Sequence, residues 1–218
     1  MPDERFVYLS DVLPTSWQAV EYAGNPEGGS VVLFGLGPIG QMSSCIVRHK
    51  GYRVIAVDLV PERLEMARRH GIEVVDLREH DGDVPETIRE MTDGRGPDSV
   101  IEAVGMEAHG SPATGLAQTI TGLLPDSVAQ AALNRGGVDR LSALYSAIET
   151  VRRGGTISII GLYGGIADPL PMLTLFDKQI QLRMGQANVK HWVEDIMPCL
   201  LTLPTRSGSR ASPRITCR

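Results

Sequence analysis

Short apolar runs alternate along the chain with stretches in which apolar residues recur every three or four positions. Runs of strand length occupy residues 31–34, 53–57, 72–75, 99–104, 156–160 and 179–184, and helical spacing occupies 39–46, 61–67, 85–91, 141–151 and 189–200. Nearly continuous apolar strands separated by helices are typical of a parallel sheet covered on both faces. The pattern therefore predicts an α/β fold, a doubly wound Rossmann sheet of six parallel strands.

The regular alternation covers residues 26–202, which we assign to one nucleotide-binding domain. Within it, residues from about 105 to 138 do not show the alternation of strand and helix patterns and are predicted to form an insertion, with a weak helix near 127–133. Residues 203–218 contain Arg, Ser, Thr and Pro but no acidic residue. Because Pro204, Gly208 and Pro213 oppose a helix, we predict a disordered or frameshifted tail rather than a phosphate-binding arm.

Composition excludes several classes of protein. The 218 residues carry a net charge of −5, which argues against a partner that is a nucleic acid or a membrane surface. No window approaches the roughly 20 apolar residues of a membrane span, and the first residues lack an apolar signal core. Three cysteines without a CxxC pair exclude a cysteine-rich zinc site. We expect a cytoplasmic protein.

A glycine motif follows the first apolar run and precedes the first helix. Gly35, Gly37 and Gly40 form a GxGxxG pattern, with Pro38 and Ile39 between them. In a βαβ unit, the first glycine makes a tight turn, the second lets the backbone approach a pyrophosphate, and the third allows close packing of helix on strand. The helix N-terminus then attracts the anion. This context predicts a dinucleotide site; the alternative is an ordinary glycine-rich turn.

An acidic residue ends the second strand. The carboxylate of Asp58 is placed to accept hydrogen bonds from both hydroxyls of an adenosine ribose and to repel a 2′-phosphate. We therefore predict NAD rather than NADP as the cofactor, by roughly a hundredfold. The alternative for Asp58 is a helix cap or a solvated loop acid. Arg63 is a second candidate for the ribose or else a surface arginine of the following helix.

Several separated motifs together resemble a known family. The motif Gly-Leu-Gly-Pro-Ile-Gly, then Asp58 with Arg63, then Glu102-Ala103-Val104-Gly105 resembles the medium-chain, zinc-type alcohol dehydrogenases. Residues 9–20 (LSDVLPTSWQAV) and the insertion beginning near Val104 resemble the formaldehyde-dehydrogenase-like, glutathione-independent branch. A methyltransferase, which also has a glycine loop and an acid after the second strand, is disfavoured by Pro38 and the six regular strands.

The resemblance implies a catalytic domain around the cofactor domain, with a zinc ion that holds the substrate alkoxide. In this branch one zinc ligand is an aspartate shortly before a Pro-Thr pair, a place that Asp11 occupies, with Thr15 as the catalytic residue. The family's cysteine and histidine ligands lie upstream of that aspartate. We therefore expect the chain to be a fragment with the catalytic domain largely missing, and residues 1–25 to be its remnant and linker.

The resemblance also implies cofactor contacts by position. Pro38 and Ile39 would lie at the pyrophosphate, Asp58 and Arg63 at the adenosine ribose, Val104 and His109 along the adenine and insertion side, and Ile160, Met184, Gly185 and Gln186 nearer the nicotinamide. Taken alone, His109 is equally well explained as a solvated loop histidine. In the family, the strand from Gln179 to Met184 pairs across a dimer, which predicts a homo-oligomer.

Two functions remain open from the sequence. The first is the NAD-binding portion of a zinc-dependent dehydrogenase that transfers hydride between NAD and a small alcohol or aldehyde. The second is a nucleotide-binding or dimerising module without catalysis. Since a catalytic zinc site uses three protein ligands and Asp11 supplies one, we expect this chain alone to retain no zinc and to be inactive.

Overall fold

A computed structural model describes residues 6–80, 83–105, 141–163 and 169–201, and it shows a six-stranded sheet in which every neighbouring pair is parallel. The strand order is β3-β2-β1-β4-β5-β6. The strands are β1 (Ser30–Phe34), β2 (Arg53–Asp58), β3 (Glu73–Asp76), β4 (Ser99–Glu102), β5 (Thr156–Ile159) and β6 (Gln181–Met184). The predicted doubly wound, six-stranded parallel sheet is confirmed.

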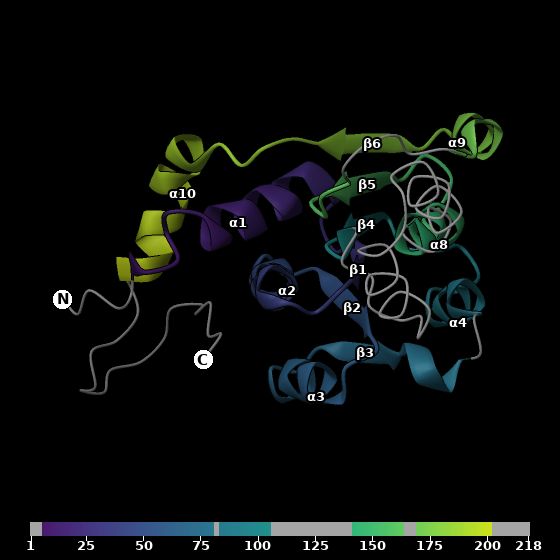
Figure 1. Cartoon of the computed structure of the whole chain (residues 1–218), viewed down its shortest axis with the longest axis horizontal. Helices are drawn as coiled ribbons and strands as arrows, with labels where there is room; N and C mark the ends of the chain where they lie inside the picture. The colour runs from purple at the N-terminus through teal and green to yellow at the C-terminus, as the bar shows by residue number, and fades with distance from the viewer. Residues whose placement is uncertain (1–5, 81–82, 106–140, 164–168, 202–218) are drawn as a thin grey trace, which may run out of the picture.

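Helices cover both faces of this sheet (Figure 1). One face carries α1 (Val12–Ala23), α2 (Pro38–His49), α3 (Pro61–Arg69) and α10 (Val189–Leu201), and the other carries α4 (Val84–Met91) and α8 (Ser142–Thr150). Two hydrophobic cores result, one on each side, and the strands contribute alternate side chains to both. Among the described residues, no helix has the length and apolar character that a membrane crossing requires.

The strands begin and end close to the predicted positions, and β4 shows why one of them is shorter. The apolar run continues to Val104, but the strand ends at Glu102. The carboxylate oxygen Oε1 of Glu102 accepts hydrogen bonds from the backbone N–H groups of Val104 and Gly105, both over 2.8 Å. These two bonds turn the chain, because the N–H groups they engage are withdrawn from strand pairing.

Two α-helices were not predicted from the sequence. Helix α1 lies in the segment that we assigned to a remnant and linker, yet Trp17, Ala19 and Val20 are buried in the core beside α2 and the sheet. Helix α9 (Met172–Lys178) precedes β6 and buries only Leu175. The predicted helix near 127–133 and the tail 203–218 lie outside the described residues.

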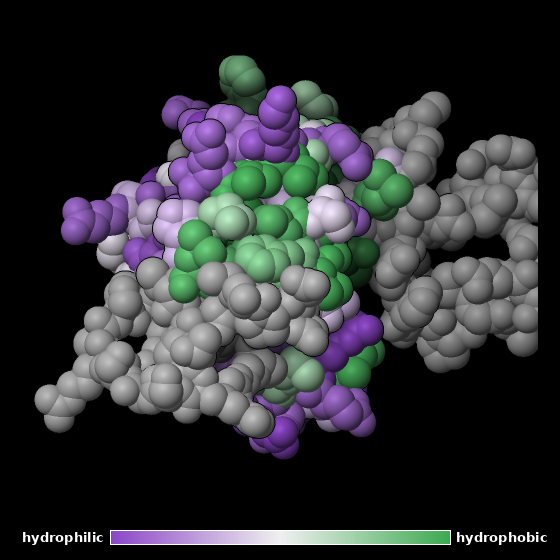
Figure 2. Space-filling model, turned by 90° about the vertical axis from the view of Figure 1, so that its left-hand side faces the viewer, coloured by the Kyte–Doolittle hydropathy of each residue, from purple (hydrophilic) through white to green (hydrophobic). Residues whose placement is uncertain are grey.

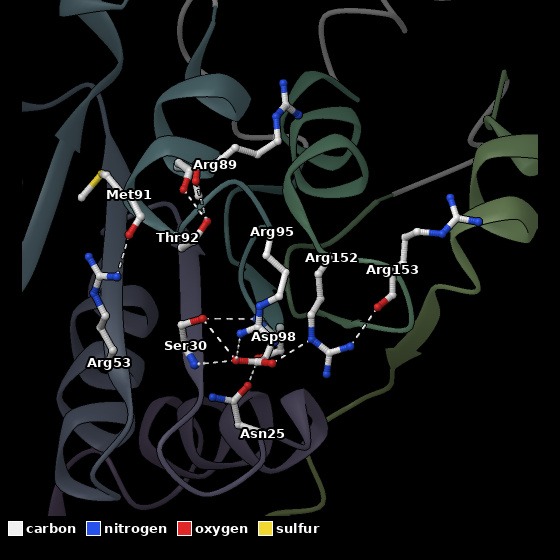
Figure 3. A network of polar contacts seen from close by, with 12 residues as sticks. Asn25, Ser30, Arg53, Arg89, Met91, Thr92, Arg95, Asp98, Arg152 and Arg153 are labelled. Carbon is white, nitrogen blue, oxygen red and sulfur yellow. Dashed lines mark hydrogen bonds and ion pairs between the residues drawn. The ribbon is translucent and has the colours of Figure 1, made fainter.

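A buried carboxylate joins three chain segments near the amino ends of β1, β4 and β5 (Figure 3). Asp98 accepts hydrogen bonds from the Ser30 N–H over 2.9 Å and from Arg152 Nε over 2.7 Å, and an ion pair joins it to Arg95 at 3.2 Å. Burial alone would raise the pKa of Asp98, but these hydrogen bonds and charges lower it below its ordinary value. The carboxylate therefore fixes the amino edge of the sheet, away from its carboxyl edge.

A pocket of about 570 Å³ opens at this same amino edge, lined among others by Arg89, Arg95, Arg152, Arg153 and Lys178. Its basic side chains already have partners. Arg95 and Arg152 pair with Asp98, Arg153 pairs with Asp177, and Lys178 Nζ donates to the carbonyl groups of Ile148 and Glu149. We assign no ligand to this pocket.

Two parts of the surface expose large apolar side chains. On the side that carries α10 and the start of α1, green atoms gather in Figure 2. Val7 and Tyr8, which precede α1, and Leu201, which ends α10, are exposed. Beside β6, helix α9 exposes Leu173 (81%) and Phe176 (83%). Apolar areas of this kind mark surfaces at which proteins associate.

Candidate functional site

The carboxyl ends of β1 and β4 define the crevice where a ligand is expected. The strand order reverses between these two neighbours, since β2 and β3 follow β1 on one side while β4, β5 and β6 extend the other. In open α/β sheets, ligands bind outside the carboxyl ends of the strands at such a switch point. The predicted glycine loop lies there, between β1 and α2.

The three glycines of this loop differ in what a side chain would meet. Gly35 has a φ of +91°, which side chains disfavour, and an added Cβ would lie 2.9 Å from Val104 Cγ2. At Gly40, an added Cβ would overlap the carbonyl oxygen of Gly35. At Gly37, an added Cβ would meet nothing within 4 Å. The loop is therefore closed at Gly35 and Gly40 and open at Gly37, where a pyrophosphate would need access to the backbone.

Helix α2 presents its N-terminus to this opening. Pro38 occupies the first turn, where its missing N–H costs no hydrogen bond. The N–H groups of Ile39 and Gly40 lie in the same turn, where the helix itself offers them no acceptor. Pro38 is exposed and Ile39 is partly exposed. These features suit an anion at the helix N-terminus.

Asp58 lies at the carboxyl end of β2 and is 5% exposed. Its Oδ2 accepts a hydrogen bond from the Leu36 N–H over 2.6 Å. Its Oδ1 accepts from the N–H groups of Leu59 and Val60 over 2.7 and 2.8 Å. A carboxylate has about four acceptor positions, so three are used and about one remains for a ribose hydroxyl. Asp58 thus has a structural role, because it accepts three backbone N–H groups, and it keeps room for one ligand contact.

Arg63 lies beside Asp58 on α3. Its Nη1 is 3.8 Å from Asp58 Oδ2, and its side chain is 51% exposed. Gln41 Nε2 donates to the Arg63 carbonyl over 2.8 Å, which joins α2 to α3. The structure therefore brings Asp58, Arg63 and the glycine loop together at one end of the crevice.

The other half of the crevice is formed by the residues that follow β4 and β5. Val104 lies against Gly35, and the Ile160 N–H donates to the Glu102 carbonyl over 2.9 Å. The side chain of Glu102 is fully buried, and burial raises its pKa above the ordinary value although two backbone N–H groups oppose the shift. This carboxyl group was not among the predicted site residues; its signal in the sequence is an acid at the end of an apolar strand.

Tyr163 is the neighbour of Glu102. Burial, and then the nearby carboxylate, raise the pKa of its hydroxyl. Glu102 and the Tyr163 hydroxyl are buried polar neighbours: the hydroxyl opposes the rise in the pKa of the carboxyl group, and the carboxyl group raises the pKa of the hydroxyl. The buried carboxyl group of Glu102 therefore supports the crevice wall, since it accepts the Val104 N–H.

Met184 ends β6, and Gly185 and Gln186 follow it at the carboxyl edge of the sheet, all three exposed. A side chain that the sequence analysis did not select holds this segment. Gln18, on α1, donates through Nε2 to the carbonyl groups of Gly185 and Gln186 over 3.1 and 3.2 Å. In the sequence, the signal is a lone polar residue between the apolar residues Trp17 and Ala19.

Asp11 and Thr15 lie together at the start of α1. The Thr15 hydroxyl donates to Asp11 Oδ1 over 3.1 Å, and Asp11 is exposed. Across the described ranges, no three His, Cys, Asp or Glu side chains form a group that could hold a metal ion. The residues present therefore do not fit a complete zinc site. His109, predicted to contact the cofactor, lies outside the described residues.

Comparison with known proteins agrees with this geometry. Residues 38–124 match the family model described as zinc-binding dehydrogenase. An uncharacterised zinc-type alcohol dehydrogenase-like protein of Bacillus subtilis is 35% identical over 194 residues, which are 88% of this chain and 47% of the relative. Formaldehyde dismutase of Pseudomonas putida is 32% identical over 207 residues, with 88% and 46% covered.

The alcohol dehydrogenase TADH from Thermus sp. ATN1 is similar in structure, with a TM-score of 0.70 at 26% identity. The match covers 92% of this chain and 49% of that one. The chain thus spans about half the length of the relatives it matches. Its fold, its motifs and these relatives agree: the chain belongs to the zinc-type alcohol dehydrogenase family and corresponds to the family's NAD-binding domain.

Proposed function

We propose that this chain binds NAD(H) along the carboxyl edge of its sheet, with the pyrophosphate at the N-terminus of α2 and the adenosine ribose at Asp58. The observation that carries the proposal is the glycine loop. It is closed at Gly35 and Gly40 and open at Gly37, and Asp58 holds its second residue, Leu36. Only an opening of this kind lets an anion approach backbone N–H groups.

The remaining predicted contacts extend the site toward β6. Val104 lines the middle of the crevice, because it lies against Gly35. Ile160 follows β5, Met184 ends β6, and Gly185 and Gln186 come directly after it, all on the half of the sheet away from Asp58. We assign them to the nicotinamide half of the cofactor, which accepts or releases a hydride when bound. The role of these residues is to orient that half along the sheet edge.

For the whole protein, we propose an NAD-dependent oxidoreductase that acts on a small alcohol or aldehyde with the aid of zinc. The names of the zinc-type alcohol dehydrogenase relatives support this class, and the similarity to formaldehyde dismutase favours formaldehyde or its hydrate as a substrate. Asp11 would be one zinc ligand. Its partner Thr15, 3.1 Å away, would hold a proton near that ligand.

We further propose that the 218-residue polypeptide by itself is a cofactor-binding module without dehydrogenase turnover. A catalytic zinc ion uses three protein ligands and one open position, and within residues 6–80, 83–105, 141–163 and 169–201 no group of three candidate ligands surrounds Asp11. Without the metal, the substrate alkoxide is not stabilised. A zinc ion lowers the pKa of bound water from 15.7 to about 7, so about 12 kcal/mol of stabilisation would be missing.

Titration of the purified polypeptide with NADH, followed by calorimetry, tests the binding proposal. We expect saturable binding of one NADH per chain and weaker binding of NADPH. Absence of NADH binding up to about 1 mM, a weak affinity for any cofactor, would contradict it. A second assay measures NADH production from formaldehyde and short alcohols with added zinc. Sustained turnover that is lost in Asp11→Ala would contradict the proposed inactivity.

A further inference from the structure

We infer that Gln18 is a positioning residue for the nicotinamide half of the cofactor site, acting through the backbone of residues 185–188. This inference rests on the proposed NAD(H) site and assigns a function to a side chain that does not itself belong to the crevice. Its basis is a set of four hydrogen bonds, of which three join α1 to the segment between β6 and α10 and one joins α1 to α10 itself.

The amide of Gln18 is 1% exposed and uses its full hydrogen-bonding capacity. Nε2 donates to the carbonyl groups of Gly185 and Gln186, over 3.1 and 3.2 Å. Oε1 accepts from the Asn188 N–H over 3.0 Å and from Trp192 Nε1 over 2.9 Å. Because two carbonyl groups face one end of the amide and two N–H groups face the other, only one orientation of the amide satisfies all four partners.

Apart from Gln18, the segment is held at its far end, where the Asn188 carbonyl accepts from the His191 and Trp192 N–H groups at the start of α10. Residues 185–188 belong to neither β6 nor α10, and Gly185, Gln186 and Asn188 are exposed. The strand before them is the edge of the sheet, with a neighbour on one side within it. Figure 1 shows this segment running along α1 toward α10. A single buried amide therefore fixes the backbone of a segment that begins where β6 ends.

Helix α1 also contacts the other half of the site. Ser16, fully buried and two residues before Gln18, has its hydroxyl 3.1 Å from the Ile39 carbonyl in the first turn of α2. One helix thus touches both the predicted pyrophosphate site and the segment at the end of β6. Loss of the Gln18 amide would release that segment while the glycine loop and Asp58 keep their own contacts.

This separation gives a specific test, a comparison of NADH with ADP-ribose, which lacks the nicotinamide. Gln18→Met keeps the side-chain volume but removes all four hydrogen bonds, so we expect its affinity for NADH to fall about tenfold while its affinity for ADP-ribose changes less than twofold. Gln18→Glu places a second carboxylate oxygen opposite two carbonyl groups, and we expect a larger loss for NADH alone.

Trp192→Phe is the matched control, because it removes one of the four bonds and leaves both Gln18 bonds to residues 185 and 186. We expect less than a threefold change for NADH, because Gln18 Nε2 still holds the carbonyl groups of Gly185 and Gln186. Calorimetry on the full 218-residue chain gives all affinities, and urea unfolding shows whether each variant is folded.

The possible outcomes separate the two proposals. If the unaltered chain binds neither ligand, the proposed NAD(H) site is wrong. If it binds both equally, or if folded Gln18→Met loses both ligands equally or neither, the positioning role of Gln18 is wrong. If Gln18→Met does not fold, hydrogen exchange on the unaltered chain decides the matter. NADH should slow exchange at residues 185–188 more than ADP-ribose does, and equal protection would overturn the inference.

Discussion

The carboxylate of Asp58 accepts the backbone N–H of Leu36 over 2.6 Å, so the residue that ends β2 also holds the second residue of the glycine loop. The same side chain accepts the N–H groups of Leu59 and Val60. A change at Asp58 therefore alters the shape of the loop as well as the charge at the ribose, and variants must separate the two effects.

Asp58→Asn removes the charge with little change in volume, but its Nδ2 cannot accept a backbone N–H, so urea unfolding must show that the loop is kept. We expect the unaltered chain to prefer NADH over NADPH by roughly a hundredfold, because a carboxylate repels a 2′-phosphate, and the variant to prefer it by less than about tenfold. Glu62→Gln removes the same charge from an exposed position nearby and serves as the control. An unchanged preference in Asp58→Asn, measured by calorimetric titration of both cofactors, would show that the carboxylate does not set it.

Alanine at two glycines of the loop should separate an effect on stability from an effect on cofactor binding. Gly40→Ala places a Cβ against the Gly35 carbonyl oxygen, so we expect a loss of several kcal/mol in the free energy of unfolding. Gly37→Ala meets open space, so we expect a folded protein with NADH affinity reduced at least tenfold, since the methyl group would occupy the pyrophosphate approach. Urea unfolding and NADH titration measure both quantities. Full NADH affinity in Gly37→Ala would argue against a pyrophosphate at this opening.

The buried carboxyl group of Glu102 predicts a pH dependence of stability. Its pKa in the folded chain is raised by burial. A raised pKa means that its contribution to stability is fully present below about pH 4.3, the value for an exposed glutamate, and is lost as the pH rises through the folded-state pKa. Glu102→Gln keeps the shape but cannot ionise.

We therefore expect the difference in unfolding free energy between Glu102→Gln and the unaltered chain to shift in favour of the variant as the pH rises from 4 toward neutrality. Groups that titrate elsewhere cancel in this difference. Urea unfolding at several pH values measures it. A difference that stays constant with pH would mean that Glu102 titrates alike in the folded and unfolded chains.

The edge strand β6 and helix α9 predict self-association. Phe176 is 83% exposed on α9, and β6 has an unpaired edge within the described sheet. Such edges pair readily with a second copy. We expect a dimer at tens of micromolar protein, about the range in which weak interfaces fill. Phe176→Glu should shift it to a monomer in sedimentation experiments.

Met66→Glu is the control for this prediction. Met66 is also exposed, at 49%, but it lies on α3, beside β3 at the opposite edge of the sheet. A new charge there should leave the dimer intact. Equal dissociation in both variants would indicate a general effect of charge, and a monomeric unaltered chain would exclude pairing through β6 at this concentration.

The sequence by itself determined the six strands, the helices that alternate with them, the glycine loop and its acidic partner. These features follow from local patterns, because strand and helix periodicity and glycine conformations are properties of neighbouring residues. Helix α1 was not predicted, because we interpreted its segment only through the resemblance to the family. Its burial depends on packing beside α2 and β5.

The tertiary structure decided which polar groups meet. Gln18 contacts Gly185 although 167 positions separate them, and no local pattern encodes such a pairing. It likewise showed that Asp58 uses three of about four acceptor positions on the backbone, and that Glu102 ends β4 by accepting the N–H groups of Val104 and Gly105. A buried polar group needs a partner, and only the folded chain fixes which partner is within reach.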